Sequence, residues 1–498
     1  MDSNHALPTG MGESDMLSRR QVLASSAAFA GAGLALTTGL LGGLAATGAA
    51  ATQATRPNIV YIIADDMGWR DAGFQGSDIK TPHIDKLAQE GARFDQFYVQ
   101  PMCTPTRAAF ITGRYPLRYG LQTGVIPAAG TYGLPLDEYL LPQTLKDAGY
   151  STALVGKWHL GHAKPEQWPR QRGFDSFYGA LVGEIDHFKH SSHGVKDWYR
   201  NNKPLEERGF DNSLFGEEAA RTIERHDTSS PLFLYLAFTA PHTPFQAPQE
   251  YLDRFKDIQD ENRRAYAAMI SVMDDGIGKV VAALDKRGMR DDTIIVFHSD
   301  NGGVKSSLFA GDSKVAGGLP ADNGPYRDGK GTLYEGGTRV VAFANWPGKI
   351  KPGTVEGMVH VVDMYPTLAA LAGAKLDHNQ PLDGMDLWPT ISEGRPSPRL
   401  EIVYNVDPMA GAVRDGDWKL VWKASLPPSV ELFDLSKDKS ETTNLADSNA
   451  DKVRDLQGRV TALAAEMKPP LLVMEAVRLT FFAPPVTPDP SVLFNLGD

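Results

Sequence analysis

Short apolar runs alternate with helix-like segments along the chain from about residue 56 to about residue 374. Four of the runs are apolar enough to be buried strands, at 58–64, 152–155, 231–238 and 293–298. Apolar residues at helical spacing predict helices over 83–90, 214–225 and 263–286. This alternation is typical of a largely parallel α/β sheet, so we expect such a sheet, sandwiched by helices, in this part of the chain.

The pattern changes beyond about residue 384. Short strands are predicted at 400–404, 412–413, 418–422 and 432–434, and turns containing Gly, Asp and Pro separate them. The segment 414–417, Arg-Asp-Gly-Asp, fits a hairpin turn. We therefore expect a smaller C-terminal domain over 381–498 with an antiparallel sheet, after a larger α/β domain over 55–380.

The N-terminal segment, residues 1–54, has the composition of an export signal. Arg19 and Arg20 precede a stretch rich in Ala, Gly and Leu that has no charged residue from Gln21 to Thr55. A paired arginine before a weakly apolar segment indicates a twin-arginine signal. The alternative is an uncleaved membrane anchor, for which the stretch is long enough but poorly apolar. We expect twin-arginine export to the periplasm or the medium.

The charge and the cysteine content narrow the possible partners. The formal net charge is −11 and no basic run exceeds a pair, which argues against a nucleic-acid-binding surface. An anionic substrate would need a local cluster of cations, because the overall field repels it. The single cysteine, Cys103, cannot form an internal disulfide.

Polar residues follow each of the four predicted strands. The first strand leads to Asp65 and Asp66, the second to Lys157 and His159, the third to His242, and the fourth to Asp300 and Asn301. Ligands of open α/β sheets bind beyond the carboxyl ends of the strands. We expect these side chains to meet at one edge of the sheet.

The acidic residues in this group suggest a metal site. Asp65, Asp66, Asp300 and the amide oxygen of Asn301 are hard oxygen ligands, which suit Ca²⁺ or Mg²⁺ better than zinc. Turns and helix caps also use Asp and Asn, and either pair alone would favour that explanation. Both pairs together, each after an apolar strand, favour a metal.

Cys103 is predicted at the start of a helix. Pro105 suits a first helical turn and Gly113 an ending, and Arg107 would lie on the same face as the cysteine. The N-terminus of a helix favours an anionic nucleophile or ligand. The alternatives are an inert buried cysteine and a thiol nucleophile, although the latter would be expected with histidine partners and without the acidic set.

Four further cationic or ionisable side chains complete the predicted site: Lys157, His159, His242 and Lys330, the last in a glycine-rich segment. Each alone would be read as a solvated loop residue or as a histidine with its hydrogen bonds satisfied. Together they could bind a tetrahedral oxyanion and protonate a leaving oxygen.

Two motifs among these residues resemble the sulfatase family, most closely the arylsulfatase B (N-acetylgalactosamine-4-sulfatase) type. Residues 103–107, Cys-Thr-Pro-Thr-Arg, are similar to the family's modification motif Cys-X-Pro-(Ser or Ala)-Arg, and residues 149–159 are similar to its second signature. The resemblance extends from about residue 57 to residue 444 and includes 172–175 and 333–337. It implies an alkaline-phosphatase-like fold. Thr106 departs from the motif, and we expect maturation to proceed with a lower yield.

The resemblance also implies a mechanism. A separate maturation enzyme would oxidise Cys103 to formylglycine, whose hydrated diol attacks the sulfur of a sulfated small molecule or saccharide and later expels sulfate. One Ca²⁺ would be held by Asp65, Asp66, Asp300, Asn301 and the modified Cys103. Arg107 and His159 would orient and deprotonate the diol. Lys157, Lys330 and His242 would bind sulfate oxygens, with His242 or Lys330 donating a proton to the departing alcohol.

A polar loop is a candidate sugar subsite. Its members are Glu184, Asp186, His187, His190 and His193. The alternative is a solvated loop without a ligand, although loops often carry function.

Other functions stay open at this point. One is a phosphonate monoester or phosphodiester hydrolase of the same superfamily. Another is a non-catalytic protein that binds sulfated glycans and never converts Cys103, and a third is a membrane-anchored envelope protein.

Overall fold

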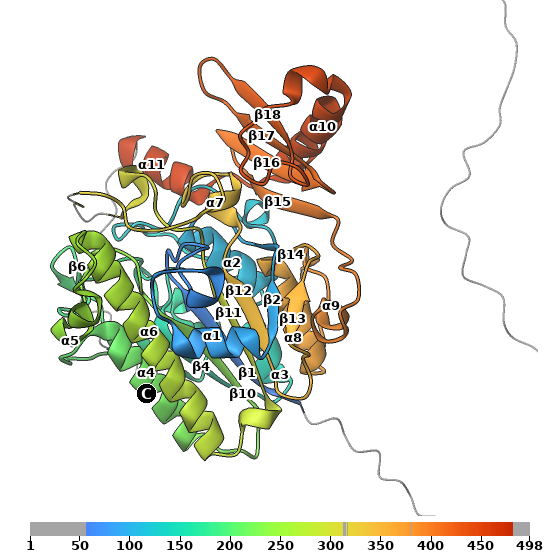
Figure 1. The fold of residues 1–498 in the computed structure, drawn as a ribbon. Coiled ribbons are helices and arrows are strands. Elements are labelled where there is room, and N and C mark those ends of the chain that lie inside the picture. Colours follow the sequence, from blue (N-terminus) through green and yellow to red (C-terminus); the bar gives the residue numbers. More distant parts are fainter. Residues whose placement is uncertain (1–55, 312–314, 316, 379, 482–498) are drawn as a thin grey trace, which may run out of the picture. The chain divides into compact units, whose positions relative to one another are not determined.

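The computed structural model describes residues 56–481 apart from 312–314, 316 and 379, so the predicted export signal lies outside the described residues. A ten-stranded sheet forms its centre (Figure 1). The four strands predicted from apolar runs are confirmed as β1 (Asn58–Ala64), β4 (Ser151–Lys157), β10 (Leu232–Ala237) and β11 (Thr293–Ser299). They are parallel neighbours in the order β11-β1-β10-β4. Their carboxyl ends therefore lie side by side.

Shorter strands extend the sheet on both sides. Next to β11 lie β12 (Ala342–Asn345), β2 (Ala92–Phe94) and β13 (Gly353–Val355), and next to β4 lie β5 (Ser176–Ala180), β8 (Tyr199–Arg200) and β9 (Lys203–Pro204). Strand β12 is antiparallel to β11, which makes the sheet mixed. The apolar pattern did not predict these strands. Two-stranded pairs form from β3 (Phe97–Tyr98) with β14 (Val359–His360) and from β6 (Ser191–Ser192) with β7 (Val195–Lys196).

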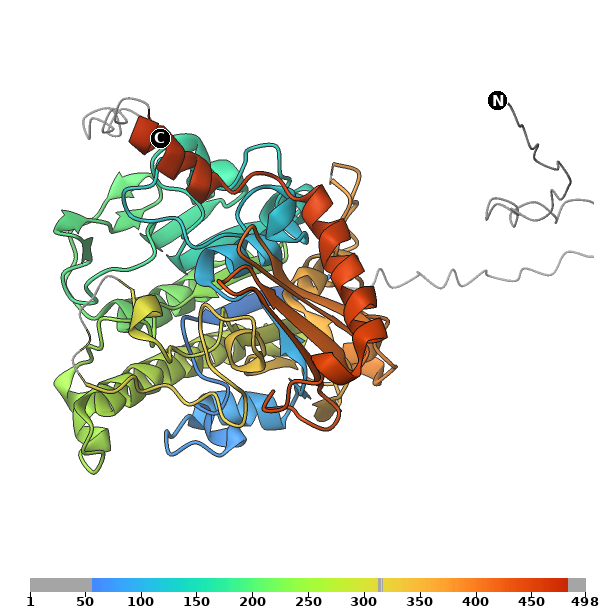
Figure 2. The same cartoon turned by 90° about the horizontal axis from the view of Figure 1, so that it is seen from above.

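Helices cover both faces of the sheet (Figures 1 and 2). On one face lie α1 (Pro82–Gln89), α4 (Asp211–Arg225) and α6 (Glu261–Lys286), and on the other lie α2 (Cys103–Thr112), α3 (Leu141–Asp147) and α8 (Met364–Leu371). Successive side chains of a strand point to opposite faces. Accordingly Val60 and Ile62 join the core beneath α6, whereas Tyr61 and Ile63 join the core beneath α2. The predicted α/β sandwich is confirmed.

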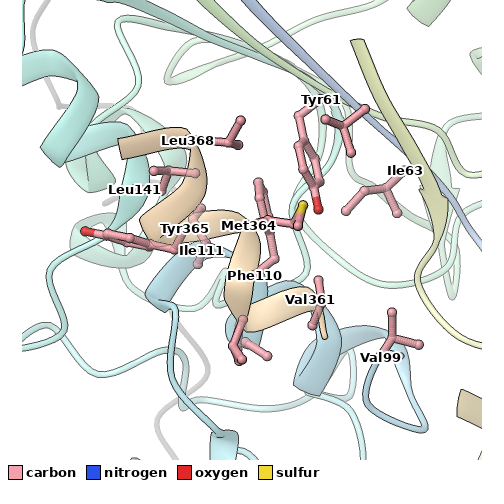
Figure 3. Packing of buried hydrophobic residues seen from close by; sticks show 14 of the residues in the cluster. Tyr61, Ile63, Val99, Phe110, Ile111, Leu141, Val361, Met364, Tyr365 and Leu368 are labelled. Atoms are coloured by element: carbon pink, nitrogen blue, oxygen red, sulfur yellow. The ribbon is translucent and has the colours of Figure 1, made fainter. Parts of the chain in front are cut away.

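Helix α2 is clamped between the sheet and α8. All its residues are buried, and the ring of Phe110 stacks on Tyr61 of β1 with 3.9 Å between centroids. Figure 3 shows Met364 and Leu368 of α8 packed on the same group of side chains. The helix ends at Gly113, whose φ of 68° favours glycine. This packing holds the first residue of the helix, Cys103, in a defined place beside the ends of the strands.

A four-stranded antiparallel sheet follows, formed by β15 (Glu401–Val406), β16 (Ala410–Asp415), β17 (Trp418–Lys423) and β18 (Ser429–Asp434). The predicted hairpin turn is confirmed, with Gly416 at φ 55° between β16 and β17. The remaining helices are α5 (Gln249–Leu252), α7 (Glu335–Thr338), α9 (Trp388–Glu393), α10 (Ala450–Glu466) and α11 (Leu471–Phe481). Within the described ranges, no helix combines the length and the apolar character needed to cross a bilayer. The predicted domain limits at 55, 380 and 381 stay predictions.

A buried carboxylate joins the small sheet to α7 and to β3 of the two-stranded β3–β14 pair. Glu335, the first residue of α7, accepts hydrogen bonds from Tyr98 Oη at 2.8 Å, Tyr404 Oη at 2.7 Å and Lys419 Nζ at 2.9 Å. Lys419 lies on β17 and is completely buried. The second carboxylate beside it is Glu441, whose Oε1 lies 2.8 Å from Lys419 Nζ. One lysine of the small sheet thus compensates the negative charge of a carboxylate on α7, the helix that follows the loop of Lys330.

Replacing this lysine should destabilise the protein strongly. In Lys419→Met, Glu335 keeps its burial and loses the nearer of its two paired cations, with Arg339 left at 3.5 Å, and breaking a buried ion pair on one side costs about 3–5 kcal/mol. Denaturant unfolding of the full chain measures this. A matched control is Lys437→Met, because Lys437 pairs with Asp434 at 2.7 Å with 82% of its side chain exposed; little change is expected there. Equal stability of the two variants would contradict the prediction.

Candidate active site

The predicted site residues converge at the carboxyl ends of the four central strands. Asp65 and Asp66 follow β1, Asp300 and Asn301 follow β11, Lys157 ends β4, and His242 follows β10. Cys103 enters from α2, and Lys330 from the loop before α7. One possible ligand atom from each of Asp65, Asp66, Cys103 and His242 lies within 4.8 Å of the others. The convergence predicted from the sequence is confirmed.

Each buried carboxylate of the site has its own cation. Lys157 Nζ lies 2.6 Å from Asp65 Oδ2, Lys330 Nζ lies 2.8 Å from Asp66 Oδ2, and Arg107 Nη2 lies 2.8 Å from Asp300 Oδ2. Burial alone would raise the pKa of Asp65, but Lys157, His242 and Arg107 together lower it to about 2. The carboxylate is therefore ionised at neutral pH. Pairing of this kind makes buried charge tolerable.

The oxygen atoms of the site fit a hard divalent cation. Asn301 Nδ2 donates to Asp66 Oδ1 at 2.7 Å, but its Oδ1 is buried and has no hydrogen-bond partner among the described residues. Buried acceptors are rarely left unsatisfied. Asp66 also has a left-handed backbone, with φ 68°, which is unusual for a residue other than glycine. An ion with oxygen ligands, such as Ca²⁺, would use the orphaned amide oxygen together with Asp65, Asp66 and Asp300.

The thiol of Cys103 points at these carboxylates. It donates to Asp65 Oδ1 at 3.4 Å and lies 3.9 Å from Asp66 Oδ1. Burial and the nearby Asp300 raise the pKa of the thiol well above its usual value. Arg107, one helical turn further along α2, reaches Asp300 instead of the sulfur. Position 103 is therefore next to the predicted ion ligands.

His159 is neutral and has one nitrogen free to accept a proton. Its Nε2 lies 3.0 Å from the carbonyl oxygen of Ile126, and a carbonyl only accepts, so Nε2 carries the proton. Nδ1 is buried and has no partner in the described part of the chain. Burial, with Lys157 and Arg107, lowers the pKa of His159 well below its usual value. Only a glycine fits opposite this ring, since a Cβ on Gly183 would lie 2.2 Å from it.

The two ring nitrogens of His242 have different partners. Nδ1 lies 2.7 Å from the carbonyl oxygen of Thr243 and must donate to it. Nε2 therefore accepts, and it lies 3.2 Å from Lys330 Nζ. The lysine also binds Asp66, so His242, Lys330 and Asp66 form one chain of polar contacts. This chain places two groups capable of proton transfer beside the carboxylates.

Comparison with known proteins agrees with the geometry. The family model described as Sulfatase matches residues 57–374. This chain belongs to the sulfatase family. The resemblance to the sulfatase family is thereby confirmed, and the alkaline-phosphatase-like fold with it.

Relatives and solved structures agree with this assignment. Arylsulfatase J of Mus musculus is 42% identical over 392 residues, which cover 76% of this chain and 63% of that protein. The N-acetylgalactosamine-6-sulfatase of Mus musculus is 36% identical over 400 residues, covering 76% of this chain and 74% of the relative. The structure of Ps i-CgsB in complex with k-i-k-neocarrahexaose has a TM-score of 0.76 at 33% identity and covers 86% of this chain and 98% of that one.

Two histidines of the predicted sugar loop are not in a position to bind sugar. His187 and His190 are buried, with exposures of 1% and 0%. His190 stacks on Trp198 at 4.1 Å between centroids. The prediction that these two line a subsite is wrong, because both rings complete the core instead of facing solvent.

His187 has a different position in the sulfatase site. Its Nδ1 lies 2.8 Å from Asp211 Oδ2, and its Nε2 lies 3.1 Å from the carbonyl oxygen of His242. Burial alone would lower the pKa of His187, but Asp211 raises it above the usual value. Both ring nitrogens thus donate, and the ring ties the backbone of His242 to α4. Asp211 was missed because the apolar pattern places the start of that helix at residue 214, although the polar residues just before it could have been read as its true start.

Removing the hydrogen bonds of His187 should lower kcat strongly and the stability of the fold much less. In a His187→Ala variant, we expect kcat for 4-nitrophenyl sulfate to fall about 10- to 100-fold because His242 is displaced. His187→Gln, which can still donate to the carbonyl, should recover part of the loss. The control is His226→Ala, since His226 is also largely buried but binds Ser230 before β10, at the opposite edge of the sheet. Equal losses of kcat in His187→Ala and His226→Ala would contradict the prediction.

Proposed function

We propose that this chain hydrolyses sulfate esters, through a formylglycine made from Cys103 and with the help of one bound Ca²⁺. The observation that carries the proposal is the position of Cys103. It opens α2 within the family's modification motif, with its Sγ 3.4 Å from Asp65 in a pocket of paired carboxylates. The relatives named above are sulfatases, which supports the reaction class.

The charges of the pocket suit a cation and a sulfate together. The three carboxylates and the three cations paired with them cancel in formal charge. A divalent ion would leave the pocket positive, and a positive pocket attracts an anionic ester in spite of the negative net charge of the chain. The ion would be held by Asp65, Asp66, Asp300 and Asn301, where it would polarise the sulfate group.

Position 103 needs a group that can both attack sulfur and release sulfate. A hydrated formylglycine would supply such a diol, whereas a serine would be left as a stable sulfate ester. Nδ1 of His159 is the unprotonated nitrogen that can take a proton from the attacking hydroxyl. Lys330 carries a proton beside Nε2 of His242 and can donate it to the departing alcohol oxygen. Lys157, released from Asp65 when the ion binds there, can bind a sulfate oxygen.

Sulfated sugars are the proposed substrates. One relative is named for N-acetylgalactosamine 6-sulfate, and one solved neighbour holds a neocarrahexaose. We further propose that a formylglycine-generating enzyme matures the chain and that the twin-arginine machinery exports it. Edman sequencing of the mature protein checks the export signal, and a product that retains the residues before Arg56 would contradict its cleavage.

The relative rates on sulfate and phosphate esters test the reaction class. We expect kcat/KM for 4-nitrophenyl sulfate to exceed that for bis(4-nitrophenyl) phosphate and for a phenylphosphonate monoester by about 100-fold, or roughly 3 kcal/mol of transition-state stabilisation. The measurement is initial-rate kinetics on protein whose Cys103 peptide carries the modification. A preference for the phosphorus esters would select the alternative hydrolase of the same superfamily.

A further inference from the structure

A cavity of about 380 Å³ lies beside the candidate active site. One wall is the loop that contains the β6–β7 hairpin, and the other is the segment that follows His242. Its polar lining residues include Glu184, Asp186, Lys189, Ser192, His193 and Gln246. Three of the five loop residues predicted for a sugar subsite therefore line one cavity, whereas His187 and His190 do not.

The cavity is close to the residues that would bind sulfate. Pro244 lines it, and Pro244 is two residues from His242, a span of about 7 Å at most. His242 in turn contacts Lys330 at 3.2 Å. The buried ring of His187, from the same loop, binds the carbonyl of His242. The loop and the segment that carries His242 are thus held together.

The polar groups of the cavity are held in fixed positions. Gln246 Nε2 donates to Asp186 Oδ2 at 3.2 Å, and Gln246 Oε1 accepts from the backbone of His187 at 3.0 Å. Asp186 Oδ1 accepts from the backbone of Lys189 at 2.8 Å. A carboxylate and an amide held in this way are suited to the hydroxyl groups of a sugar, and preorganisation lowers the cost of binding.

The charge of the cavity distinguishes it from the sulfate pocket. Two carboxylates, Glu184 and Asp186, face it. Among the lining residues that the structure describes, the lysine is Lys189, which has 79% of its side chain exposed and lies 3.9 Å from Asp186. Exposed charge is screened by water, so the cavity offers an anion little. A sulfate group would be repelled, and a neutral sugar would not.

We propose that this cavity binds the unsulfated sugar residue that is linked to the sulfated one. The proposal rests on the proposed sulfatase function and adds the class of substrate: an oligosaccharide whose residue next to the scissile sulfate carries hydroxyl groups and no charge.

Matched pairs of substrates test the subsite. The probes are N-acetylgalactosamine 6-sulfate and galactose 4-sulfate, each as the free sugar and as the terminal residue of a trisaccharide that is otherwise unsulfated. For at least one of the two pairs we expect kcat/KM for the trisaccharide to exceed that for the free sugar about 10-fold or more. A second sulfate on the neighbouring residue should abolish the gain.

Two variants test the cavity, one through its shape and one through its charge. Ser192→Trp fills the cavity, and the ratio of kcat/KM between trisaccharide and free sugar should fall to about one. Glu184→Gln keeps the shape and removes a charge, so the penalty for the second sulfate should fall at least threefold. The control is Ser229→Trp, at an exposed serine before β10 on the opposite edge of the sheet, which should keep the ratio of the unaltered protein.

The outcomes separate the subsite from the reaction. A ratio near one for both pairs in the unaltered protein, with 4-nitrophenyl sulfate still hydrolysed, would overturn the subsite and leave the sulfatase proposal intact. A ratio that survives in Ser192→Trp would also overturn it. If protein bearing the modification hydrolyses none of these esters, the proposed function fails and the subsite with it.

Discussion

A Cys103→Ser variant is expected to lose steady-state hydrolysis of 4-nitrophenyl sulfate by about 10⁴-fold or more, the size of effect seen when a catalytic nucleophile is removed. The serine hydroxyl has the right position at the start of α2, so it can be sulfated once. It lacks a second hydroxyl and cannot expel the sulfate. We therefore expect a burst of at most one nitrophenol per chain, followed by no turnover.

Mass spectrometry of the peptide spanning residue 103 makes this experiment decisive. In the active parent protein the peptide should have lost one sulfur and two hydrogens and gained one oxygen. In Cys103→Ser it should gain a sulfate after incubation with the ester, and the control Cys103→Ala should show neither burst nor adduct. An intact thiol in fully active protein would refute the formylglycine proposal.

Removal of the metal should be almost as damaging. Treatment with EDTA, or the substitution Asp65→Ala, is expected to lower kcat/KM about 10³-fold, because an ion that polarises the ester supplies several kcal/mol. Asp65→Ala additionally leaves Lys157, completely buried, without its partner at 2.6 Å. Added Ca²⁺ should restore the EDTA-treated parent protein but not the variant.

Metal content gives a second readout that does not depend on activity. Elemental analysis should find about one calcium per chain in the parent protein and much less in Asp65→Ala. Asp363→Asn is the control. Asp363 directly precedes α8, is as buried as Asp65, and pairs with Arg399 instead of with a residue of the site. This variant should lose stability and keep its calcium. Turnover that survives both chelation and Asp65→Ala would exclude a catalytic ion.

The parallel strands were predictable because their signal is local. Strands β1, β10 and β11 are buried on both faces, so their residues read as nearly continuous apolar runs. The boundaries were close: β1 is the predicted segment, and β4 extends from the predicted 152–155 to Ser151–Lys157. Strands such as β2 and β12 are only three and four residues long, too short for periodicity to reveal.

The loop before β7 shows where local reasoning fails. His187 and His193 are both histidines of one polar loop, and the sequence alone assigned both to a sugar subsite. In the structure His193 lines the cavity and His187 fastens His242 to Asp211. What separates them is burial between segments far apart in the chain, which no window of neighbouring residues contains.

The sequence by itself determined the fold class, the helix that begins at Cys103, and the set of residues that gather at the strand ends, because apolar periodicity and short motifs are written in adjacent positions. Only the tertiary structure decided which cation pairs with which carboxylate, that Asn301 keeps an amide oxygen unpartnered, and that the cavity beside His242 carries acidic groups. These are contacts between segments brought together by packing: Asp66 and Asp300 are separated by 234 positions and meet at 3.2 Å through a backbone amide. Their partners depend on distances of a few ångströms that the packed core alone sets.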